Sequence, residues 1–252
     1  MVVHYRTIGF VFKREDRIES DRIFTVFTYD FGRIEIFAKA IRKIASKLKG
    51  GIEIFSLSEI EFIQGKNRKT LTDANLIEKF NNIIEVPEKI EIFNKISDML
   101  DSFIKGQEPD EKIWSLIMDF SEKLNNTDLT VNNQQLLYYY FVWNFISILG
   151  YSPELSRCAI CNQKLNPYNL YFSNREGGII CKVCYFAKKE GVRVKSDIVK
   201  ILRLILNGDW RTVFKLKIES SSQNLLKEIS NDYCNYLMHS YSLIRSKDNL
   251  LV

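Results

Sequence analysis

Histidine is scarce in this 252-residue chain, which holds only His4 and His239. The two lie near opposite ends and outside any metal motif, which argues against a zinc-dependent nuclease or deaminase. No H-x-E is paired with P-C-x-x-C, as a zinc deaminase requires, and no G-x-x-x-x-G-K-[ST] phosphate loop occurs. We therefore predict no catalytic residue and expect a protein that is not an enzyme.

Cysteine, proline and long apolar runs are also scarce. Five cysteines and the lack of a signal peptide argue against a secreted disulfide scaffold. The longest apolar run, Leu136 to Leu149, contains Asn144 and Ser147 and is too short to span a bilayer. We therefore expect a soluble, cytoplasmic protein with reduced thiols. Four prolines and no Pro- or Gly/Ser-rich linker suggest domains that pack on each other.

Charge is unevenly distributed along the chain, although the net charge is only +5. Residues 1–80 carry a net +4, residues 81–157 a net −6, and residues 158–252 a net +7. Two basic ends around an acidic middle suggest a polyanionic partner for the ends. Ordinary solvated surface charge is the alternative interpretation of these counts.

Four cysteines form the most informative pattern: Cys158, Cys161, Cys181 and Cys184. Two C-x-x-C turns separated by a short loop can supply the four corners of a tetrahedral zinc site. A hairpin over Tyr168 to Ser173, turning at Gly177-Gly178, would bring the two turns together. Four thiolates close the zinc shell, so the predicted metal is structural. Redox pairs or plain buried cysteines are the alternatives, and Cys234 is expected to be a core residue.

The first eighty residues are rich in strand patterns. We predict strands over His4–Lys13, Arg22–Thr28, Arg33–Lys39 and Ile52–Ile63, the last as one long or two short strands. Helical spacing predicts a helix over Thr72–Ile84. Several short strands and one helix in this length favour a small closed barrel such as an OB-fold.

An acid-free run of cations lies between the third and fourth predicted strands. Cations on an OB-fold rim can follow a phosphate backbone while aromatic rings stack on bases. The predicted nucleic-acid-binding residues are Lys39, Arg42, Lys43, Lys47 and Lys49, helped by Arg14, Arg17 and Arg33. Phe31, Phe37 and Phe55 are candidates for stacking, with a place in the core as the alternative. Lysines in a loop are also a common aid to solubility.

The rest of the chain is predicted to be mainly helical. Apolar spacing predicts helices that begin near Pro87 and Pro109, and a very apolar helix over Gln134–Leu149 that belongs in the centre of a bundle. After the cysteines we expect a basic helical tail over Tyr185–Lys195, then helices from Ser196 and over Ser222–Arg245.

Four stretches, taken in order, resemble the RecO family of bacterial DNA repair and recombination mediators. Glu19 to Thr28 followed by Phe31-Gly32-Arg33 resembles the family's early strand pair, and L-G-Y-S-P-E-L at Leu149–Leu155 resembles its helix end. The first cysteine turn follows at once, and G-G-I-I-C-K-V-C resembles the family's second. Asn162 stands where the family commonly has Gly, but Asn also tolerates the left-handed conformation.

The resemblance implies an α+β fold: an N-terminal OB-fold β-barrel followed by an α-helical domain with an embedded four-cysteine zinc module. The expected boundaries are 1–82 for the barrel, 83–156 with 186–252 for the helical domain, and 157–185 for the zinc module. It also implies a cytoplasmic, nucleoid-associated protein that binds single- and double-stranded DNA, anneals strands and helps load RecA on SSB-coated single strands.

RecR and SSB are the implied partners, with RecA an indirect one. The acidic tail of SSB suits a basic receptor, either the adjoining helical domain or the basic C-terminal part with Lys188, Lys189, Arg193 and Arg203. A zinc-ribbon module that binds only proteins is the main alternative, and a zinc-dependent enzyme acting on nucleic acid is another.

Overall fold

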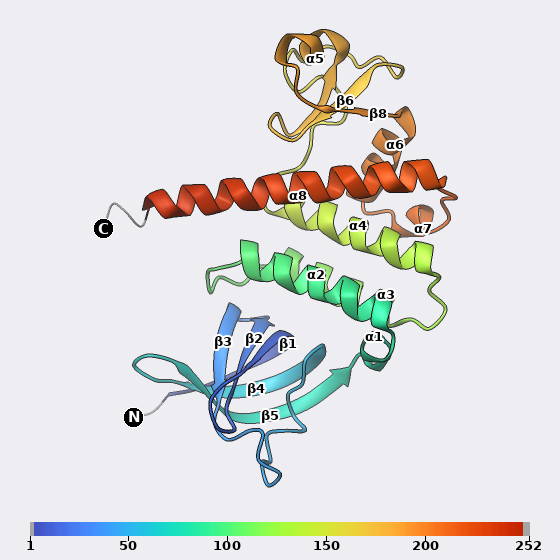
Figure 1. The fold of residues 1–252 in the computed structure, drawn as a ribbon. Helices are drawn as coiled ribbons and strands as arrows, with labels where there is room; N and C mark the ends of the chain where they lie inside the picture. Colours follow the sequence, from blue (N-terminus) through green and yellow to red (C-terminus); the bar gives the residue numbers. More distant parts are fainter. Residues whose placement is uncertain (1–2, 249–252) are drawn as a thin grey trace. The chain divides into compact units, whose positions relative to one another are not determined.

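The computed structural model describes residues 3–248 and divides into two compact units, Met1–Leu129 and Thr130–Val252 (Figure 1). Residues 1–2 of the predicted barrel domain and 249–252 of the predicted helical domain lie outside the described residues. The finer division into barrel, helical domain and zinc module stays a prediction. No described helix is both long and apolar enough to cross a membrane.

Five strands of the first unit close into a barrel in the order β1-β2-β3-β5-β4. They are β1 (His4–Asp16), β2 (Arg22–Thr28), β3 (Gly32–Ala38), β4 (Ser56–Gln64) and β5 (Lys69–Lys79). All pairings are antiparallel except the short parallel contact between β3 and β5. This arrangement confirms the predicted OB-type barrel, and with the helices that follow it confirms the α+β fold class.

Alternation along the strands builds the barrel core. In β3, Ile34, Ile36 and Ala38 are buried while Glu35 is exposed, as a strand with one face inward requires. The buried set continues on the other strands with Val11, Phe24, Val26, Ile60, Phe62 and Leu71. Burial of these apolar side chains is the main stabilising contribution to the barrel.

The predicted helix over Thr72–Ile84 is wrong, because the chain forms β5 up to Lys79 and a helix only over α1 (Asn81–Glu85). The backbone of β5 pairs with β4 from Lys69 to Lys79 and closes the barrel against β3. A register shift in the β4–β5 pairing puts Leu71 and Ala74, three residues apart, on the same buried side. The helix was predicted from the spacing of Leu76, Ile77, Phe80 and Ile83, but Leu76 and Ile77 are exposed on β5, and the buried Phe80 and Ile83 come only after the strand.

Two helices complete the first unit, α2 (Pro87–Phe103) and α3 (Glu111–Asn125). Pro87 occupies the first turn of α2, as predicted. The Asp110 carboxylate caps α3 by accepting hydrogen bonds from the backbone N–H groups of Lys112 and Ile113. The Phe93 ring of α2 contacts rings of the barrel, Phe10 and Phe55, and of α3, Phe120. These contacts join the helices to the barrel within this unit.

The second unit is organised on α4 (Val131–Ile148), which is buried on most sides, as its composition predicted. Its other helices are α5 (Lys182–Lys188), α6 (Ser196–Leu206), α7 (Trp210–Val213) and α8 (Ser220–Asp248). The indole of Trp143 stacks on Tyr233 of α8 and donates to Ser230 Oγ at 2.9 Å. The other helices of this unit therefore pack around α4.

A small three-stranded sheet lies between α4 and α6 in the chain: β6 (Leu170–Ser173), β7 (Gly178–Cys181) and β8 (Val192–Val194). The predicted hairpin over the first two strands is confirmed. The predicted helical tail over Tyr185–Lys195 is wrong, because α5 ends at Lys188 and β8 pairs with β6. Phe172 of β6 packs against Trp143 and Tyr233, which fixes the sheet to the helices of the same unit.

Candidate metal centre and nucleic-acid interface

The two C-x-x-C pairs lie on different kinds of local structure. Cys158 and Cys161 stand on a turn closed by a hydrogen bond from the Asn162 N–H to the Cys158 carbonyl at 2.9 Å. Asn162 has a φ of 59°, so the residue at the family's usual glycine position takes the left-handed conformation. Cys181 ends β7 and Cys184 lies in the first turn of α5.

The four thiol sulfurs converge, all within 4.8 Å of one another. The Cys161 and Cys181 sulfurs are 3.8 Å apart. Sulfurs bound to one zinc ion at about 2.3 Å stand roughly 3.8 Å apart at the corners of a tetrahedron. The donor set and spacing therefore fit a metal ion of this kind, and the cluster can hold one.

The surroundings of the sulfurs favour a thiolate on one of them. Burial acts to raise the pKa of Cys158, but the backbone N–H groups of Cys161, Cys181 and Ile160 bring it down to about 6. Burial and the neighbouring sulfurs raise the pKa of Cys184 to about 12. Four thiolates repel one another, and a divalent cation would relieve that repulsion.

Cys234, the fifth cysteine, is buried in α8, and burial raises the pKa of its thiol to about 11. This agrees with its prediction as a core residue, because a buried neutral thiol is a poor nucleophile. No disulfide joins any of the five cysteines, all of which lie in the described part.

The predicted DNA-binding residues come to lie on the loop between β3 and β4 and on the neighbouring strands of the barrel. Residues 39–49, the basic loop, expose all five of their cations: Lys39, Arg42, Lys43, Lys47 and Lys49. Arg14 on β1 and Arg17 in the β1–β2 turn are exposed as well. Arg33 differs, since its side chain is only 13 % exposed and bonds Asp101 at 2.5 Å and Glu35 at 2.9 Å.

The basic loop is held against the β1–β2 turn. The Ala40 N–H donates to Asp21 Oδ1 at 2.7 Å, and the Arg42 N–H donates to the Ser20 carbonyl at 2.9 Å. Ile41 inserts into the barrel core. At the far end of the connection, Gly51 lies so close to β5 that a Cβ atom would stand 1.8 Å from the Ala74 carbonyl oxygen. The cations therefore project from an anchored backbone.

Three arginines surround Asp16 at the end of β1. Arg22 Nε bonds the Asp16 carboxylate at 2.6 Å, and Arg42 lies 3.5 Å from it. The hydrogen bond from Arg22, with the charges of Arg42 and Arg14, holds the pKa of Asp16 below its ordinary value. Arg22 was not among the predicted site residues, because its place in a strand pattern hid its charge.

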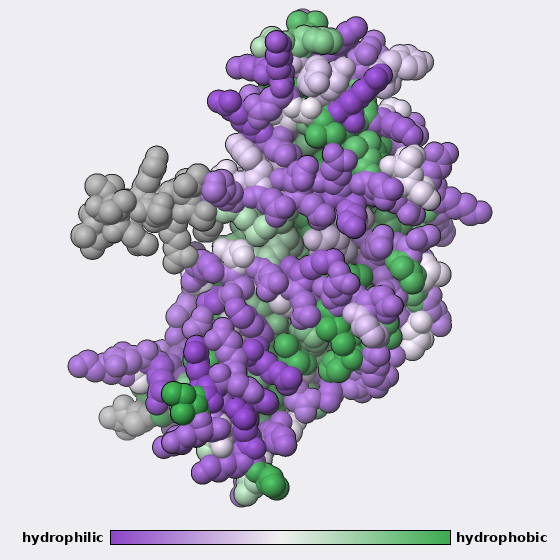
Figure 2. Space-filling model, viewed as in Figure 1, coloured by the Kyte–Doolittle hydropathy of each residue, from purple (hydrophilic) through white to green (hydrophobic). Residues whose placement is uncertain are grey.

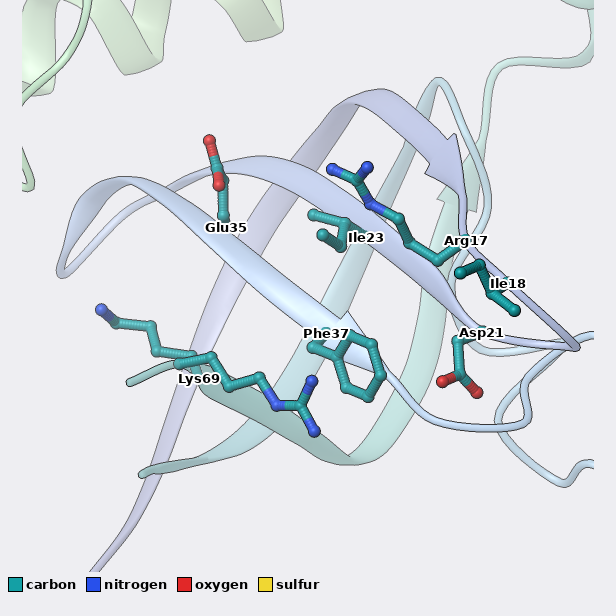
Figure 3. A pocket seen from close by; sticks show the side chains of 8 residues that line it. Arg17, Ile18, Asp21, Ile23, Glu35, Phe37 and Lys69 are labelled. Atoms are coloured by element: carbon teal, nitrogen blue, oxygen red, sulfur yellow. The ribbon is translucent and has the colours of Figure 1, made fainter. Parts of the chain in front are cut away.

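A hollow of about 450 Å³ opens beside the β1–β2 turn (Figure 3). We call its lining the barrel face: Arg17, Ile18, Asp21, Ile23, Glu35, Phe37, Arg68 and Lys69. In Figure 3, Phe37 points into the hollow, with Arg17 and Ile18 of the turn on one side and Lys69 on the other. The lining comes from β2, β3, the first residue of β5 and the turns that precede β2 and β5.

Phe37 is the stacking candidate that the structure leaves accessible at this hollow. Its ring is half-buried and the Arg68 guanidinium lies 3.8 Å above the ring centroid. Phe55 is buried against α2, and Phe31 contacts the rings of Tyr5 and Phe62. Arg68 and Lys69 were not among the predicted site residues, although they lie in G-K-N-R-K, a second short basic run without acidic residues.

Both carboxylates of the barrel face are engaged within the protein. Asp21 accepts from the Ala40 backbone, and Glu35 accepts from Arg33. Burial lowers the pKa of Lys69, whose ammonium donates to Gln107 at 2.9 Å. The groups of the hollow that remain available to contact a ligand are therefore mainly cationic or apolar.

A second groove, of about 330 Å³, lies in the helical part of the second unit. Its apolar floor is made by α6 and the segment before α8, and basic residues stand at its rim. It is lined by Lys195, Asp197, Lys200, Ile201, Leu204, Leu216, Lys217, Ile218, Glu219 and Ser222. Among the predicted tail-binding residues, Arg203 instead donates to the Leu155 carbonyl, and Lys188, Lys189 and Arg193 lie near the cysteines.

Comparison with known proteins gives consistent matches over most of the chain. The model described as "Recombination protein O N terminal" matches residues 1–80, and "Recombination protein O C terminal" matches residues 87–242. A DNA repair protein RecO of Dehalococcoides mccartyi is 32% identical over 225 residues, covering 89% of this chain and 86% of the relative. The RecO proteins of Desulforamulus reducens and Caldanaerobacter subterraneus are 24% and 25% identical, over 93% and 96% of this chain and 90% and 96% of the relatives.

Proposed function

The chain belongs to the RecO family of DNA repair proteins, and from that premise we propose that it is a recombination mediator that binds DNA through the barrel face and the basic loop. One observation carries this proposal: a half-buried aromatic ring, Phe37, stands under the Arg68 guanidinium in a hollow that Arg17 and Lys69 also line. In OB-folds, the face of strands 2 and 3 and the adjoining loops bind oligonucleotides.

The arrangement suits single-stranded DNA for a physical reason. Base stacking on an aromatic ring is indifferent to sequence, and cations beside it neutralise the phosphates. Arg33 is left out of the proposed contact set because Asp101 and Glu35 already hold it. The contact set keeps the other seven predicted cations and adds Arg68 and Lys69, while Arg22 is left out because Asp16 holds it at 2.6 Å. Double-stranded DNA would be held by the same cations without stacking.

The proposed role is to anneal strands and to help load RecA on SSB-coated single strands, with RecR and SSB as partners. Family membership supports these roles. We propose further that the protein acts without catalysis and holds a structural Zn²⁺ through Cys158, Cys161, Cys181 and Cys184. Four thiolates fill a tetrahedral shell, which leaves no position for a substrate. Metal-stimulated turnover of a nucleotide or DNA substrate would contradict the absence of catalysis.

The test of the barrel proposal is a charge reversal in the basic loop. Replacing Arg42, Lys43 and Lys47 with Glu is expected to weaken single-stranded DNA binding by well over tenfold. It should also flatten the salt slope by about two units, since each lost phosphate contact removes roughly 0.7. The measurement is fluorescence anisotropy of a labelled oligonucleotide across a salt series, with thermal melting to check the fold.

A matched triple of the same charge controls for net charge. Lys95 on α2, Lys112 on α3 and Lys227 on α8 are exposed, belong to neither the barrel face nor the basic loop, and are replaced with Glu together. We expect this variant to bind DNA within about twofold of the wild type at moderate salt, where distant charges are screened. Equal weakening by both triples would reduce the effect to net charge and overturn the proposed interface. Salt-independent or absent DNA binding would favour a module that binds only proteins.

For the acidic tail of SSB, we propose the groove between α6 and the segment before α8. Its apolar floor can bury side chains of the tail, and Lys195 and Lys217 complement the tail's charge, whereas Lys200 pairs with Asp197 at 3.2 Å. Replacing Ile201 with Asp would place a carboxylate in the floor, and a tail peptide titrated at low salt should then bind at least tenfold more weakly. Unchanged peptide affinity in the folded variant would place the receptor elsewhere.

A further inference from the structure

The short helix α5 carries an apolar surface on the opposite side from the thiol it supplies. Cys184 is buried toward the metal site, whereas Val183 is 77 % exposed and Phe186 is 59 % exposed. In Figure 2, hydrophobic residues reach the surface over α5, at the top of the view. Neighbouring exposed apolar side chains surrounded by charged residues indicate a contact surface, whereas a single exposed apolar residue does not.

Phe186 is the outermost ring of an ordered aromatic series. Tyr171 of β6 is buried and stacks on Tyr185 with ring centroids 3.8 Å apart and planes 7° apart. Tyr185 contacts Phe186 edge-on at 5.5 Å. Tyr171 and Tyr185 also pack with the cysteine cluster. A rigid support therefore holds Phe186 in place, which lowers the entropy cost of stacking a ligand on it.

Positive charge surrounds this ring. Residues 157–195, here called the cysteine module, contain eight Lys or Arg and only two Glu. Lys182 Nζ lies 5.8 Å from the Phe186 ring centroid, and Lys189 follows at the end of α5. Arg193 pairs with Tyr171 across β6 and β8, so it lies on the sheet face that bears the aromatic series.

These three cations are available to a ligand. Lys182, Lys189 and Arg193 are exposed, and no carboxylate of the described residues lies within 4.0 Å of their charged groups. The nearest acidic residue in sequence, Glu190, pairs with Arg175 at 3.7 Å. A neutral apolar partner would cover the ring but leave the cations unmatched, whereas a polyanion with flat aromatic groups matches both.

We propose that this α5 surface, made of Lys182, Val183, Phe186, Lys189 and Arg193, is a second contact site for single-stranded nucleic acid. A base stacks on Phe186 and the three cations meet the flanking phosphates. The inference rests on the proposed function in one respect, namely that the chain binds DNA at all. The site shares no residue with the barrel face, and its residues belong to the other compact unit.

The test exchanges the ring for groups of known stacking ability in the full-length, zinc-loaded protein. Phe186→Leu keeps an apolar side chain but removes the π face, and Phe186→Trp keeps the π face. The probe is a thymidine-rich oligonucleotide of about 30 residues, longer than the roughly 4–16 nucleotides that one OB-fold covers. Iodinated thymidine analogues in this probe are photo-crosslinked to the protein, and the linked peptide is identified by mass spectrometry.

We expect the wild-type crosslink to fall within residues 182–193, and Phe186→Leu to abolish it and weaken affinity about fivefold. Phe186→Trp should retain both. Lys182→Glu with Lys189→Glu should flatten the salt slope by about 1.4 units, two contacts at the single-strand coefficient. Tyr168→Leu is the matched control, because Tyr168 is another exposed ring of the cysteine module, outside α5, and its loss should leave affinity unchanged.

Full binding and crosslinking by Phe186→Leu would overturn the inference, as would an equal loss in Tyr168→Leu. Unchanged DNA binding combined with loss of a protein partner in Phe186→Leu would make the surface a protein site instead. Failure of the proposed function looks different. In that case the wild-type protein shows no salt-dependent DNA binding, whereas failure of this inference alone leaves binding that responds to the basic-loop triple but not to Phe186.

Discussion

The cysteine cluster and the barrel face are assembled over very different lengths of chain. The four thiols come from residues 158–184, where two turns repeat the same spacing and one hairpin brings them together. The barrel face draws on residues 17–69, namely on parts of β2 and β3, the start of β5 and two turns, which meet only when the barrel closes. A local site can be recognised from its spacing, whereas a distributed site depends on strand pairing.

The two sites also differ in what their residues do for stability. Four thiolates at this distance would repel one another, so a metal held by the four cysteines would add to the stability of the cysteine module. The barrel is already stabilised by its apolar core, and its surface cations contribute little to folding. Variants in the two regions should therefore separate stability from DNA binding.

The largest effect should follow loss of a thiol. Cys184→Ser is expected to remove the metal and to lower the melting temperature of the second unit by about 10 °C or more, since structural zinc sites contribute on the order of 10 kcal/mol. Calorimetry and metal analysis provide the measurement. Cys234→Ala is the control, expected to keep one metal ion per chain. A Cys184→Ser protein with unchanged melting would show that the cluster is not a structural metal site.

The next effect tests whether Arg33 is part of the barrel's internal structure. Asp101→Asn leaves Arg33 and Lys13 without their carboxylate, and we expect a loss of about 2 kcal/mol of unfolding free energy at pH 7. DNA affinity should change by less than about twofold, because neither cation faces the hollow. A large gain in affinity would return Arg33 to the DNA interface.

The pH dependence of that variant follows from Asp101. Burial alone would raise the pKa of Asp101, but hydrogen bonds from Lys13 and Arg33 hold it below its ordinary value. A carboxylate with a depressed pKa stabilises the fold above its unfolded pKa of about 4, and this contribution is lost as pH falls through the folded pKa. The stability difference between wild type and Asp101→Asn should therefore shrink below about pH 4 in denaturant titrations. A constant difference down to about pH 2 would contradict this coupling.

A moderate effect separates the two phenylalanines of the barrel. Phe37→Leu should weaken single-stranded DNA binding about fivefold or more and leave the melting temperature nearly unchanged. Phe31→Leu should do the reverse, because its ring contacts Tyr5 and Phe62 beside the barrel core. Anisotropy and thermal melting of both variants give the comparison. If both lose stability and neither loses affinity, Phe37 is a packing residue.

The smallest expected change in DNA affinity follows substitution of Asp16, the carboxylate that lies among three arginines. Asp16→Asn removes a negative charge shared by Arg14, Arg22 and Arg42. DNA binding should tighten by about two- to threefold at low salt, and the gain should fade at high salt as surface charges are screened. The matched control is Asp73→Asn, on the exposed side of β5, which should change affinity less. Equal gains would mean that only net charge matters.

Several elements of the fold could be predicted because their signals are local. A run rich in Ile, Phe, Val and Thr predicted β2 residue for residue, proline placed the start of α2, and uniform apolarity placed α4 in the interior. The error at β5 had a tertiary cause, since a bulge and the closure of the barrel overrode a helical spacing. The short strand β8 was missed because three residues carry little periodic signal, and pairing with β6 decided its form.

The sequence by itself determined the family, the cysteine set and the positions of the main cations, since each depends on residue types at short spacing. Only the tertiary structure decided which cations remain available. It sets Arg33 against Asp101, brings Arg68 over Phe37 and supports Phe186 on two tyrosines. The physical reason is that exposure and pairing arise from strand register and helix packing, which join residues far apart in the chain.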